Sequence, residues 1–316
     1  SDYLIDRQPA FMASLKMSSD RVVGGETVND ENLSGRRLAD GATYFYRTGN
    51  EYQDIFPVWD WRKIPGTTSL QDNASLEWPK PDLAAAPAFV GGVSDGHDAC
   101  AVMDFHRAGV SAHKAWFFHE DTILCLGAAI HSDSPDPLVT TLNQCLLTGP
   151  ITVDREGAAA PETLAAASAT LTHFQWLEHA GFRYTPLQRD PWQLTAGPRT
   201  GNWKTVFRSP ATPAANVTKN VFTLAIDHGP RAADASYAYA VTPANTAAAA
   251  ILLANTPAVQ CVRFADGSLV AALWSASSAT LDHLAIESDA PCLLLISHTA
   301  GAAHTCFSGH IFKFHV

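Results

Sequence analysis

Short runs of β-branched and aromatic residues recur along most of the chain, and turn signals such as Asp40-Gly41, Asp95-Gly96 and His228-Gly229-Pro230 separate them. Helical periodicity is nearly absent. This pattern predicts an all-β protein made of antiparallel sheets packed as a sandwich. The clearest predicted strands are Ala42–Arg47, Ala99–Phe105, Lys114–Phe118, Thr122–Leu126, Val221–Ile226, Ser236–Val241 and Cys292–Ile296.

Two stretches are predicted to be helical. Pro161 to Ala169 is rich in alanine with an acidic residue near its start, and Asn245 to Asn255 begins with a plausible N-cap at Asn245 or Thr246. The second stretch is a candidate joint between domains. We therefore expect a large sheet domain at residues 1–245 and a small β-domain at residues 246–316.

Composition narrows the class of protein. The 316 residues are 47% hydrophobic and only 16% charged, which argues against disorder, coiled coil and collagen. The longest apolar run, Ala247 to Ala254, is too short to span a bilayer. The formal net charge is −10 and the basic residues are scattered, so a nucleic-acid partner is disfavoured, and no membrane partner is expected.

Cysteine spacing excludes zinc-ribbon and thioredoxin motifs, because no two cysteines lie two or three residues apart. We expect them to be small buried residues. The chain opens at Ser1 without an initiator Met or a leader, so we expect either that a signal has been removed or that the chain is a piece of a longer polypeptide. The six cysteines are Cys100, Cys125, Cys145, Cys261, Cys292 and Cys306.

Three further patterns are interpreted as ordinary structure. Gly92-Val-Ser94-Asp-Gly96 fits the hydrolase pattern G-x-S-x-G, but a strand-like segment follows it, so a turn between strands is expected. The C-terminal His304, His310 and His315 lack partners at metal-ligand spacing. The acidic loops Asp72-Asn73 and Asp133–Asp136 are expected to be surface turns. No cofactor is predicted, and a structural calcium ion is left unassigned.

Two stretches have a residue composition that is unusual for a β-sandwich. Glu and Asn make up four of the first seven residues of Glu26–Gly35, and such groups can orient a cationic or phenolic partner and bind sugar hydroxyls, or form a solvated loop. Trp59 and Trp61 share one face of an extended segment, either as a stacking platform for sugar rings or as packing anchors. Arg62 and Lys63 form a small basic spot beside them.

At these residues the sequence resembles polysaccharide lyase family eight, which contains hyaluronate lyases, chondroitin AC and ABC lyases and xanthan lyase. The matching segments keep their order from about residue 2 to residue 255. They are Asn29-Asp-Glu31-Asn32-Leu-Ser-Gly35, Asp40–Tyr44, Asp54–Thr68, Phe89–Gly96, Ala115–Phe118, Leu126–Ile130, Thr140–Gln144, Thr200–Trp203, Asp227–Gly229 and Ala235–Tyr239.

The resemblance implies a large antiparallel supersandwich, galactose mutarotase-like, followed by a small β-sandwich domain. It also implies cleavage of a uronate-containing polysaccharide by β-elimination, leaving 4,5-unsaturated uronate ends. In the family the Asn, His, Tyr and Arg of the machinery come from an N-terminal α/α-toroid, which this chain lacks, so the chain alone is expected to be inactive and to have that toroid as its partner. A secreted, extracellular location is expected.

The resemblance also assigns site residues. Glu31 of the Asn-x-Glu-Asn motif is expected to reach into the catalytic cleft from the sandwich, where a carboxylate can tune the catalytic Tyr electrostatically. Asn29 and Asn32 are expected to shape the same edge of the cleft. Trp59, Trp61 and Arg62 are candidate substrate-binding residues.

Two other functions stay open. One is a stand-alone, non-catalytic glycan-binding β-sandwich that uses Trp59 and Trp61. The other is an aldose epimerase, which would need His and Glu to converge in a groove of the sandwich. The net charge of −10 also conflicts with an acidic polysaccharide substrate, since like charges repel. The conflict weakens if the cationic part of the cleft belongs to the toroid.

Overall fold

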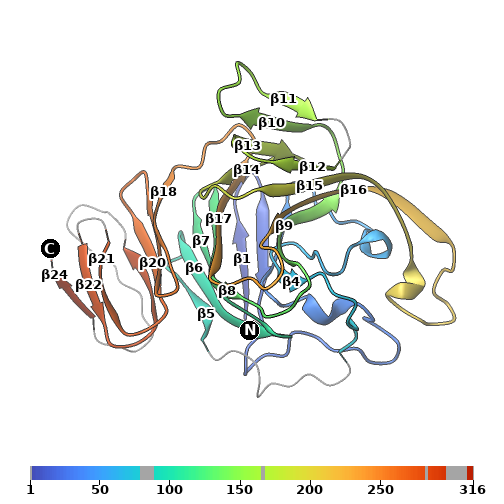
Figure 1. Ribbon diagram of the computed structural model, residues 1–316, viewed down its shortest axis with the longest axis horizontal. Coiled ribbons are helices and arrows are strands. Elements are labelled where there is room, and N and C mark those ends of the chain that lie inside the picture. Colours follow the sequence, from blue (N-terminus) through green and yellow to red (C-terminus); the bar gives the residue numbers. More distant parts are fainter. Residues whose placement is uncertain (1, 79–88, 165–167, 282–283, 297–311, 316) are drawn as a thin grey trace.

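The computed structural model describes residues 2–78, 89–164, 168–281, 284–296 and 312–315. Within these residues it consists of antiparallel sheets joined by loops, with three short 3-10 helices: η1 (Gly35–Arg37), η2 (Phe56–Val58) and η3 (Trp203–Thr205). The predicted supersandwich, followed by a small β-domain, is confirmed (Figure 1).

A nine-stranded sheet forms the centre of the molecule, in the order β11-β10-β13-β14-β17-β8-β7-β6-β5. Its strands are β5 (Val90–Ser94), β6 (Ala99–Arg107), β7 (Val110–His119), β8 (Thr122–His131), β10 (Ile151–Arg155), β11 (Glu162–Leu164), β13 (Phe174–His179), β14 (Phe182–Pro186) and β17 (Ala235–Pro243).

Two smaller sheets pack on the inner face of this sheet. The five-stranded sheet has the order β12-β15-β16-β9-β4 and the three-stranded sheet the order β1-β2-β3. Their strands are β1 (Tyr3–Arg7), β2 (Met12–Lys16), β3 (Ala42–Tyr46), β4 (Thr68–Leu70), β9 (Leu138–Leu146), β12 (Ser168–Leu171), β15 (Trp192–Asn202) and β16 (Asn216–Asp227). Large side chains of all three sheets, including Phe45, Trp116 and Trp192, form one buried core.

The C-terminal strands form two further sheets, and the four-stranded one covers the outer face of the nine-stranded sheet (Figure 1, left). They form a four-stranded sheet, β18-β19-β20-β23, and a three-stranded one, β21-β22-β24. Their bounds are β18 (Ala250–Asn255), β19 (Val259–Phe264), β20 (Leu269–Leu273), β21 (Ser277–Leu281), β22 (Leu284–Ser288), β23 (Cys292–Ile296) and β24 (Phe312–His315).

Coverage on both faces explains why central strands carry almost unbroken apolar runs. In β7, Trp116 belongs to the inner core, whereas Phe117 packs against the C-terminal sheet. In β8, Cys125 is in the inner core and Leu124 in the outer one. Successive side chains of a strand point to opposite faces, so a strand covered on both faces needs apolar residues at every position.

Both predicted helices are wrong. The first stretch contains β11, which pairs with β10, and β12, which pairs with β15; residues 165–167 lie outside the described part. In the second, Asn245 has a φ of 66° in a turn, and β18 then pairs with β19. Helix propensity is a weak preference, and the neighbouring strands β10, β15 and β19 provide backbone partners that outweigh it.

Other predictions on ordinary structure hold where the structure describes them. Five cysteines are buried, as expected, while Cys306 lies outside the described residues. Ser94 ends β5, and its Oγ donates a hydrogen bond to the Asp98 carbonyl within the turn to β6, so the turn between strands is confirmed.

The described part of the chain contains neither a metal-ligand cluster nor a membrane-spanning helix. No group of three or more His, Cys, Asp or Glu there is arranged to hold a metal ion. His304 and His310 lie outside it, and for His315 only the backbone of β24 is described. No helix within the same residues is long and apolar enough to cross a membrane.

Lys114 of β7 is fully buried in the inner core. Its Nζ donates hydrogen bonds to the carbonyl oxygens of Asp40, at 3.2 Å, and Gly66, at 2.6 Å. The ammonium also lies 5.3 Å from the ring centroid of Trp116. Lys114 therefore ties the two long connections that flank β3 to the central sheet, because it satisfies carbonyl groups that would otherwise be buried without partners.

Lys114 should make stability depend on pH. Burial lowers the pKa of Lys114 to about 7, whereas an unfolded lysine titrates near ~10.4. Between these values the unfolded chain binds the extra proton, so the free energy of unfolding should rise with pH. Urea unfolding measures this dependence. The free energy of unfolding of the wild type, minus that of Lys114→Met, should become more positive by up to ~1.4 kcal/mol per pH unit above pH ~7. A difference that stays constant from pH ~7 to ~9 would contradict this.

Gly201 should tolerate no side chain. It lies in β15, and a Cβ there would overlap the carbonyl oxygen of Pro57 in η2. Gly201→Ala should therefore lower the free energy of unfolding by ~2 kcal/mol or more, since overpacking forces backbone shifts. Gly91→Ala in β5 is the matched control, because nothing lies within 4 Å of its Cβ position. Equal thermal stability of the two variants would show that this backbone approach is not tight.

Candidate functional site

The stretch singled out by the sequence forms an exposed turn in the connection between β2 and β3. Val28 and Glu31 form an isolated bridge, with the Glu31 amide donating to the Val28 carbonyl at 2.9 Å. Asn29 and Asp30 between them have φ values of 52° and 59°. Positive φ at both central residues defines a type I′ turn, a conformation that Asn and Asp tolerate well. Asn29 and Asp30, the two central residues, are exposed at its tip, and Glu31, the last residue of the turn, is exposed beside them.

Asn32 closes the base of this turn. Its Nδ2 donates to the Glu26 carbonyl at 3.0 Å, and Thr27 Oγ1 donates to the Asn32 carbonyl at 3.0 Å. Asn32 has a φ of 55°, and a Cβ on Gly35 would overlap its Oδ1. The structure therefore gives the half-buried Asn32 a bracing role in the loop. Residues 26–32, called the Glu26–Asn32 loop below, carry three exposed carboxylates, Glu26, Asp30 and Glu31.

Backbone hydrogen bonds join this loop and the residues that follow it to two segments distant in sequence. The Arg208 amide donates to the Asp30 carbonyl at 2.9 Å, and the Leu33 amide to the Val206 carbonyl at 3.0 Å. The Thr27 amide donates to the Trp78 carbonyl at 3.0 Å. Segments 72–78 and 202–208 thus form the immediate surroundings of the loop.

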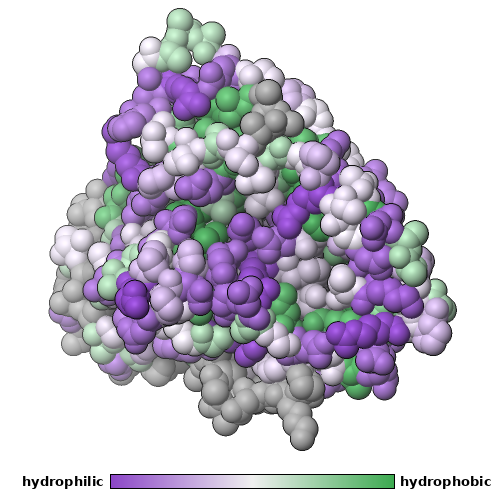
Figure 2. All heavy atoms as spheres, turned by 45° about the vertical axis from the view of Figure 1, so that its right-hand side comes forward, coloured by the Kyte–Doolittle hydropathy of each residue, from purple (hydrophilic) through white to green (hydrophobic). Residues whose placement is uncertain are grey.

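A hollow of about 760 Å³ opens between these segments and is lined by Arg62, Lys204 and Arg208. Arg208 pairs with Glu77 at 3.0 Å, and Arg62 pairs with Asp72 at 3.1 Å. Within the described residues, Lys204 has no carboxylate within ion-pair distance, and its Nζ donates to a backbone carbonyl. The hollow is therefore more basic than the chain as a whole. Figure 2 turns this side forward and shows mostly hydrophilic residues on it.

The structure does not support Trp59 and Trp61 as a sugar-stacking platform. They are only 6% and 8% exposed, and each indole N–H donates to a backbone carbonyl at 3.1 Å. Both belong to a buried cluster beneath the loops, so the packing alternative is correct. Ile55, Val58 and Ile64 belong to the same buried cluster. Packing both indole rings against them removes a large apolar surface from water, which favours burial of the rings over their exposure.

Two aromatic rings that the sequence pattern did not single out, Phe56 and Trp203, do reach the surface. Phe56 is 39% exposed, and its ring centroid is 6.4 Å from that of the half-buried Trp203. Trp203 is followed by Lys204, whose side chain lines the hollow. The signal available in the sequence was the Thr200-Gly-Asn-Trp203 segment, but nothing in it shows that η2 and η3 meet.

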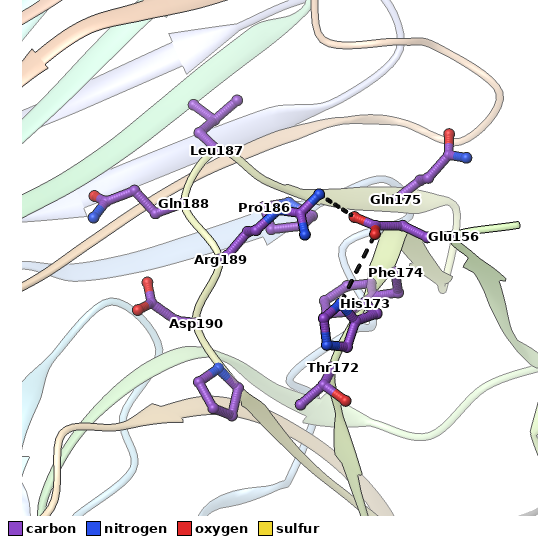
Figure 3. A pocket seen from close by; sticks show the side chains of 11 residues that line it. Glu156, Thr172, His173, Phe174, Gln175, Pro186, Leu187, Gln188, Arg189 and Asp190 are labelled. Atoms are coloured by element: carbon purple, nitrogen blue, oxygen red, sulfur yellow. Dashed lines mark ion pairs between the residues drawn. The ribbon is translucent and has the colours of Figure 1, made fainter.

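A second pocket of about 450 Å³ lies where the connections β12–β13 and β14–β15 pass between the five-stranded and the nine-stranded sheet (Figure 3). Glu156 is paired there with Arg189 at 3.2 Å and with His173 at 3.9 Å. The epimerase alternative required such a meeting of His and Glu. However, His173 is 74% exposed and Glu156 already binds Arg189. An exposed, paired carboxylate is a poor base, so this pocket does not favour that alternative.

Comparisons with known proteins agree with this fold. The family model "Polysaccharide lyase family 8, super-sandwich domain" matches residues 1–251, and "Polysaccharide lyase family 8, C-terminal beta-sandwich domain" matches residues 252–308. Chondroitinase-AC of Pedobacter heparinus is 35% identical over 95% of this chain and 44% of its own length. Xanthan lyase of a Bacillus species is 32% identical over 89% of this chain and 32% of its own length.

Solved structures give the same result. A chondroitinase AC lyase superimposes with a TM-score of 0.86 at 34% identity, over 95% of this chain and 46% of the other. The Paenibacillus xanthan lyase gives a TM-score of 0.84 at 25% identity, over 95% of this chain and 30% of the other. The chain thus spans less than half the length of these relatives. It belongs to polysaccharide lyase family 8.

Proposed function

We propose that the chain is the C-terminal β portion of a secreted lyase that cleaves a uronate-containing polysaccharide, of the chondroitin, hyaluronan or xanthan type, by β-elimination. The observation that carries the proposal is the exposed, braced Glu26–Asn32 loop beside a basic hollow, in a chain of this family. Secretion is proposed because a polymeric substrate of this kind does not cross a cell membrane.

β-Elimination requires three things: neutralisation of the uronate carboxylate, a base that removes the C5 proton, and an acid that protonates the leaving oxygen. Six of the seven tyrosines of this chain are poorly suited as the base. Burial raises the pKa of six of the seven, and the seventh, Tyr3, lies on β1. This supports our proposal that Tyr, Asn, His and Arg come from an N-terminal α-domain of the same enzyme.

The part assigned to this chain is electrostatic. We propose that Glu31 faces the catalytic cleft, accepts hydrogen bonds from the cationic residues of the α-domain and holds them toward the Tyr base. Asn29, exposed beside it, can bind sugar hydroxyls. The type I′ turn fixes the direction of both side chains before substrate arrives, and such preorganisation is what stabilises developing charge in a transition state.

The basic hollow is proposed to bind the acidic groups of the polysaccharide. Arg62, Lys204 and Arg208 present guanidinium and ammonium groups on one side of an otherwise acidic chain. Local potential, rather than net charge, governs the approach of a charged ligand to a cleft. The formal charge of −10 is therefore compatible with a polyanionic substrate, and Arg62 is proposed as one of the residues that bind it.

The stand-alone glycan-binding alternative is also favoured by one observation: a basic hollow and the ring pair Phe56 and Trp203, which adjoins it through Lys204, offer an acidic glycan a binding surface without catalysis. Ultraviolet absorbance of unsaturated uronate, followed with the isolated chain and with the full-length enzyme, separates the two. Product formed by the full-length enzyme but not by the isolated chain supports the proposal that the chain is a portion of a lyase. Glycan binding by the isolated chain, with no product from either sample, supports the alternative.

Glu31→Gln should lower kcat of the full-length enzyme by ~10²-fold with little change in KM, because an interaction specific to the transition state is lost. Glu26→Gln is the matched variant on the same loop. If Glu31→Gln leaves kcat unchanged while Glu26→Gln lowers it, the role belongs to Glu26. If neither changes kcat, the electrostatic role proposed for Glu31 is wrong and does not belong to Glu26 either.

Lys204→Ala should raise KM of the full-length enzyme by ~5-fold at low salt and leave kcat unchanged, since a charge that binds substrate and transition state equally is removed. The effect should shrink at high ionic strength, where surface charges are screened. Lys219→Ala is the control, because Lys219 lies on β16 with its Nζ bonded to the Gln53 carbonyl, outside the hollow. Equal effects of both variants would rule out specific binding in the hollow.

A further inference from the structure

Arg107, the last residue of β6, lies beneath the connection that carries the Glu26–Asn32 loop. Its Nη1 donates to the Arg36 carbonyl at 3.1 Å, and its Nη2 donates to Ser18 Oγ at 3.0 Å. Ser18 and Arg36 flank the loop on either side in sequence. One guanidinium group therefore holds both ends of the connection, in a planar geometry that an ammonium group does not reproduce.

The same guanidinium is also an electrostatic anchor. Nη1 lies 2.8 Å from Oδ1 of Asp40, whose side chain is fully buried, and Arg107 itself is only 10% exposed. Neither carboxylate oxygen of Asp40 has a hydrogen-bond partner in the described part of the chain, so the attraction is Coulombic. Charge attraction is strong where water is excluded, so Arg107 cannot easily leave this position.

Arg107 reaches the loop itself through Trp78. Its guanidinium carbon lies 4.3 Å from the centroid of the Trp78 ring, in cation–π geometry. Trp78 and Thr27 exchange two hydrogen bonds: the Thr27 amide donates to the Trp78 carbonyl at 3.0 Å, and the Trp78 amide to Thr27 Oγ1 at 2.9 Å. Thr27 Oγ1 in turn donates to the Asn32 carbonyl. The contacts are continuous from the sheet to the turn.

We infer that Arg107 is a positioning residue for the lyase reaction: by clamping Ser18, Arg36 and Trp78, it fixes the direction in which the Glu26–Asn32 loop presents its carboxylates. This rests on the proposed function of the loop. Arg107 touches no substrate and acts through Trp78. A misplacement of ~1 Å at a catalytic group costs on the order of 10²-fold in rate, so loss of the clamp should reduce kcat more than binding.

The chain offers a matched control for this clamp. Arg183 of β14 pairs with Glu178 at 2.8 Å, stacks 4.2 Å from the Trp176 ring centroid and is 14% exposed. Its contacts resemble those of Arg107, but none of them reaches the Glu26–Asn32 loop. Arg183→Met therefore removes a comparable ion pair and ring contact from the same sandwich.

The test compares Arg107→Met, Arg107→Lys and Arg183→Met in the full-length enzyme. We expect Arg107→Met to lower kcat by ~10-fold or more with KM changed less than ~3-fold. Arg107→Lys, which keeps the charge near Asp40 but loses the fork, should fall between it and wild type. Arg183→Met should lower Tm without changing kcat. If Arg107→Met and Arg183→Met have equal effects on Tm and kcat, Arg107 is only a structural residue and the inference is overturned.

Hydrogen exchange of the amides at 27–35 separates failure of this inference from failure of the proposed function. Faster exchange in Arg107→Met than in Arg183→Met, together with the fall in kcat, supports the clamp. Unchanged exchange overturns it. Faster exchange with unchanged kcat overturns its catalytic consequence. The Glu31→Gln and Glu26→Gln variants, in which Arg107 is intact, report on the proposed function alone.

Discussion

The architecture depends on how the buried amine of Lys114 and the guanidinium of Arg107 hold long loops against a central sheet. The connections before and after β3 lie over β6 and β7, where their carbonyl groups would be buried without partners. Lys114 satisfies the carbonyls of Asp40 and Gly66 from below, and Arg107 satisfies that of Arg36. A buried cation is costly unless such partners surround it, so the loops and the charges stabilise one another. The surface that we assign to substrate is built on this arrangement.

The sequence predicted the sheets well and the loops poorly, for physical reasons. Alternation and turn signals are local, so strands such as β8 were found from their residues alone. The helix predicted at 245–255 failed because pairing with β19 is a tertiary effect. The roles of Trp59 and Trp61 stayed undecided, since two tryptophans in an extended segment give the same sequence pattern whether their rings are buried or exposed. Contacts between η2 and η3 join residues almost 150 positions apart, which no local pattern reveals.

For the candidate site, the motif located the loop but not its support. Asn29, Glu31 and Asn32 were found through their resemblance to a family, and the structure adds that Asn32 braces the turn while the other two project from it. Arg107 carried no sequence signal, because an arginine at the end of a strand is usually a solvated residue. Its importance arises only from segments that fold over it. Residues of this kind are visible only when the tertiary structure is known.

The two faces of the nine-stranded sheet have a consequence for how the chain divides. Two family models meet at residues 251 and 252, and a modular protein would separate there. Yet a single buried cluster spans this border. It contains Phe117 and Leu124 of the central sheet together with Val262 and Leu295 of the C-terminal sheet. A chain cut at this border would expose a contiguous apolar face on each product, and such faces associate. The C-terminal sheet thus completes the outer core of the central sheet, so the two parts should be exchanged together in recombination between family members.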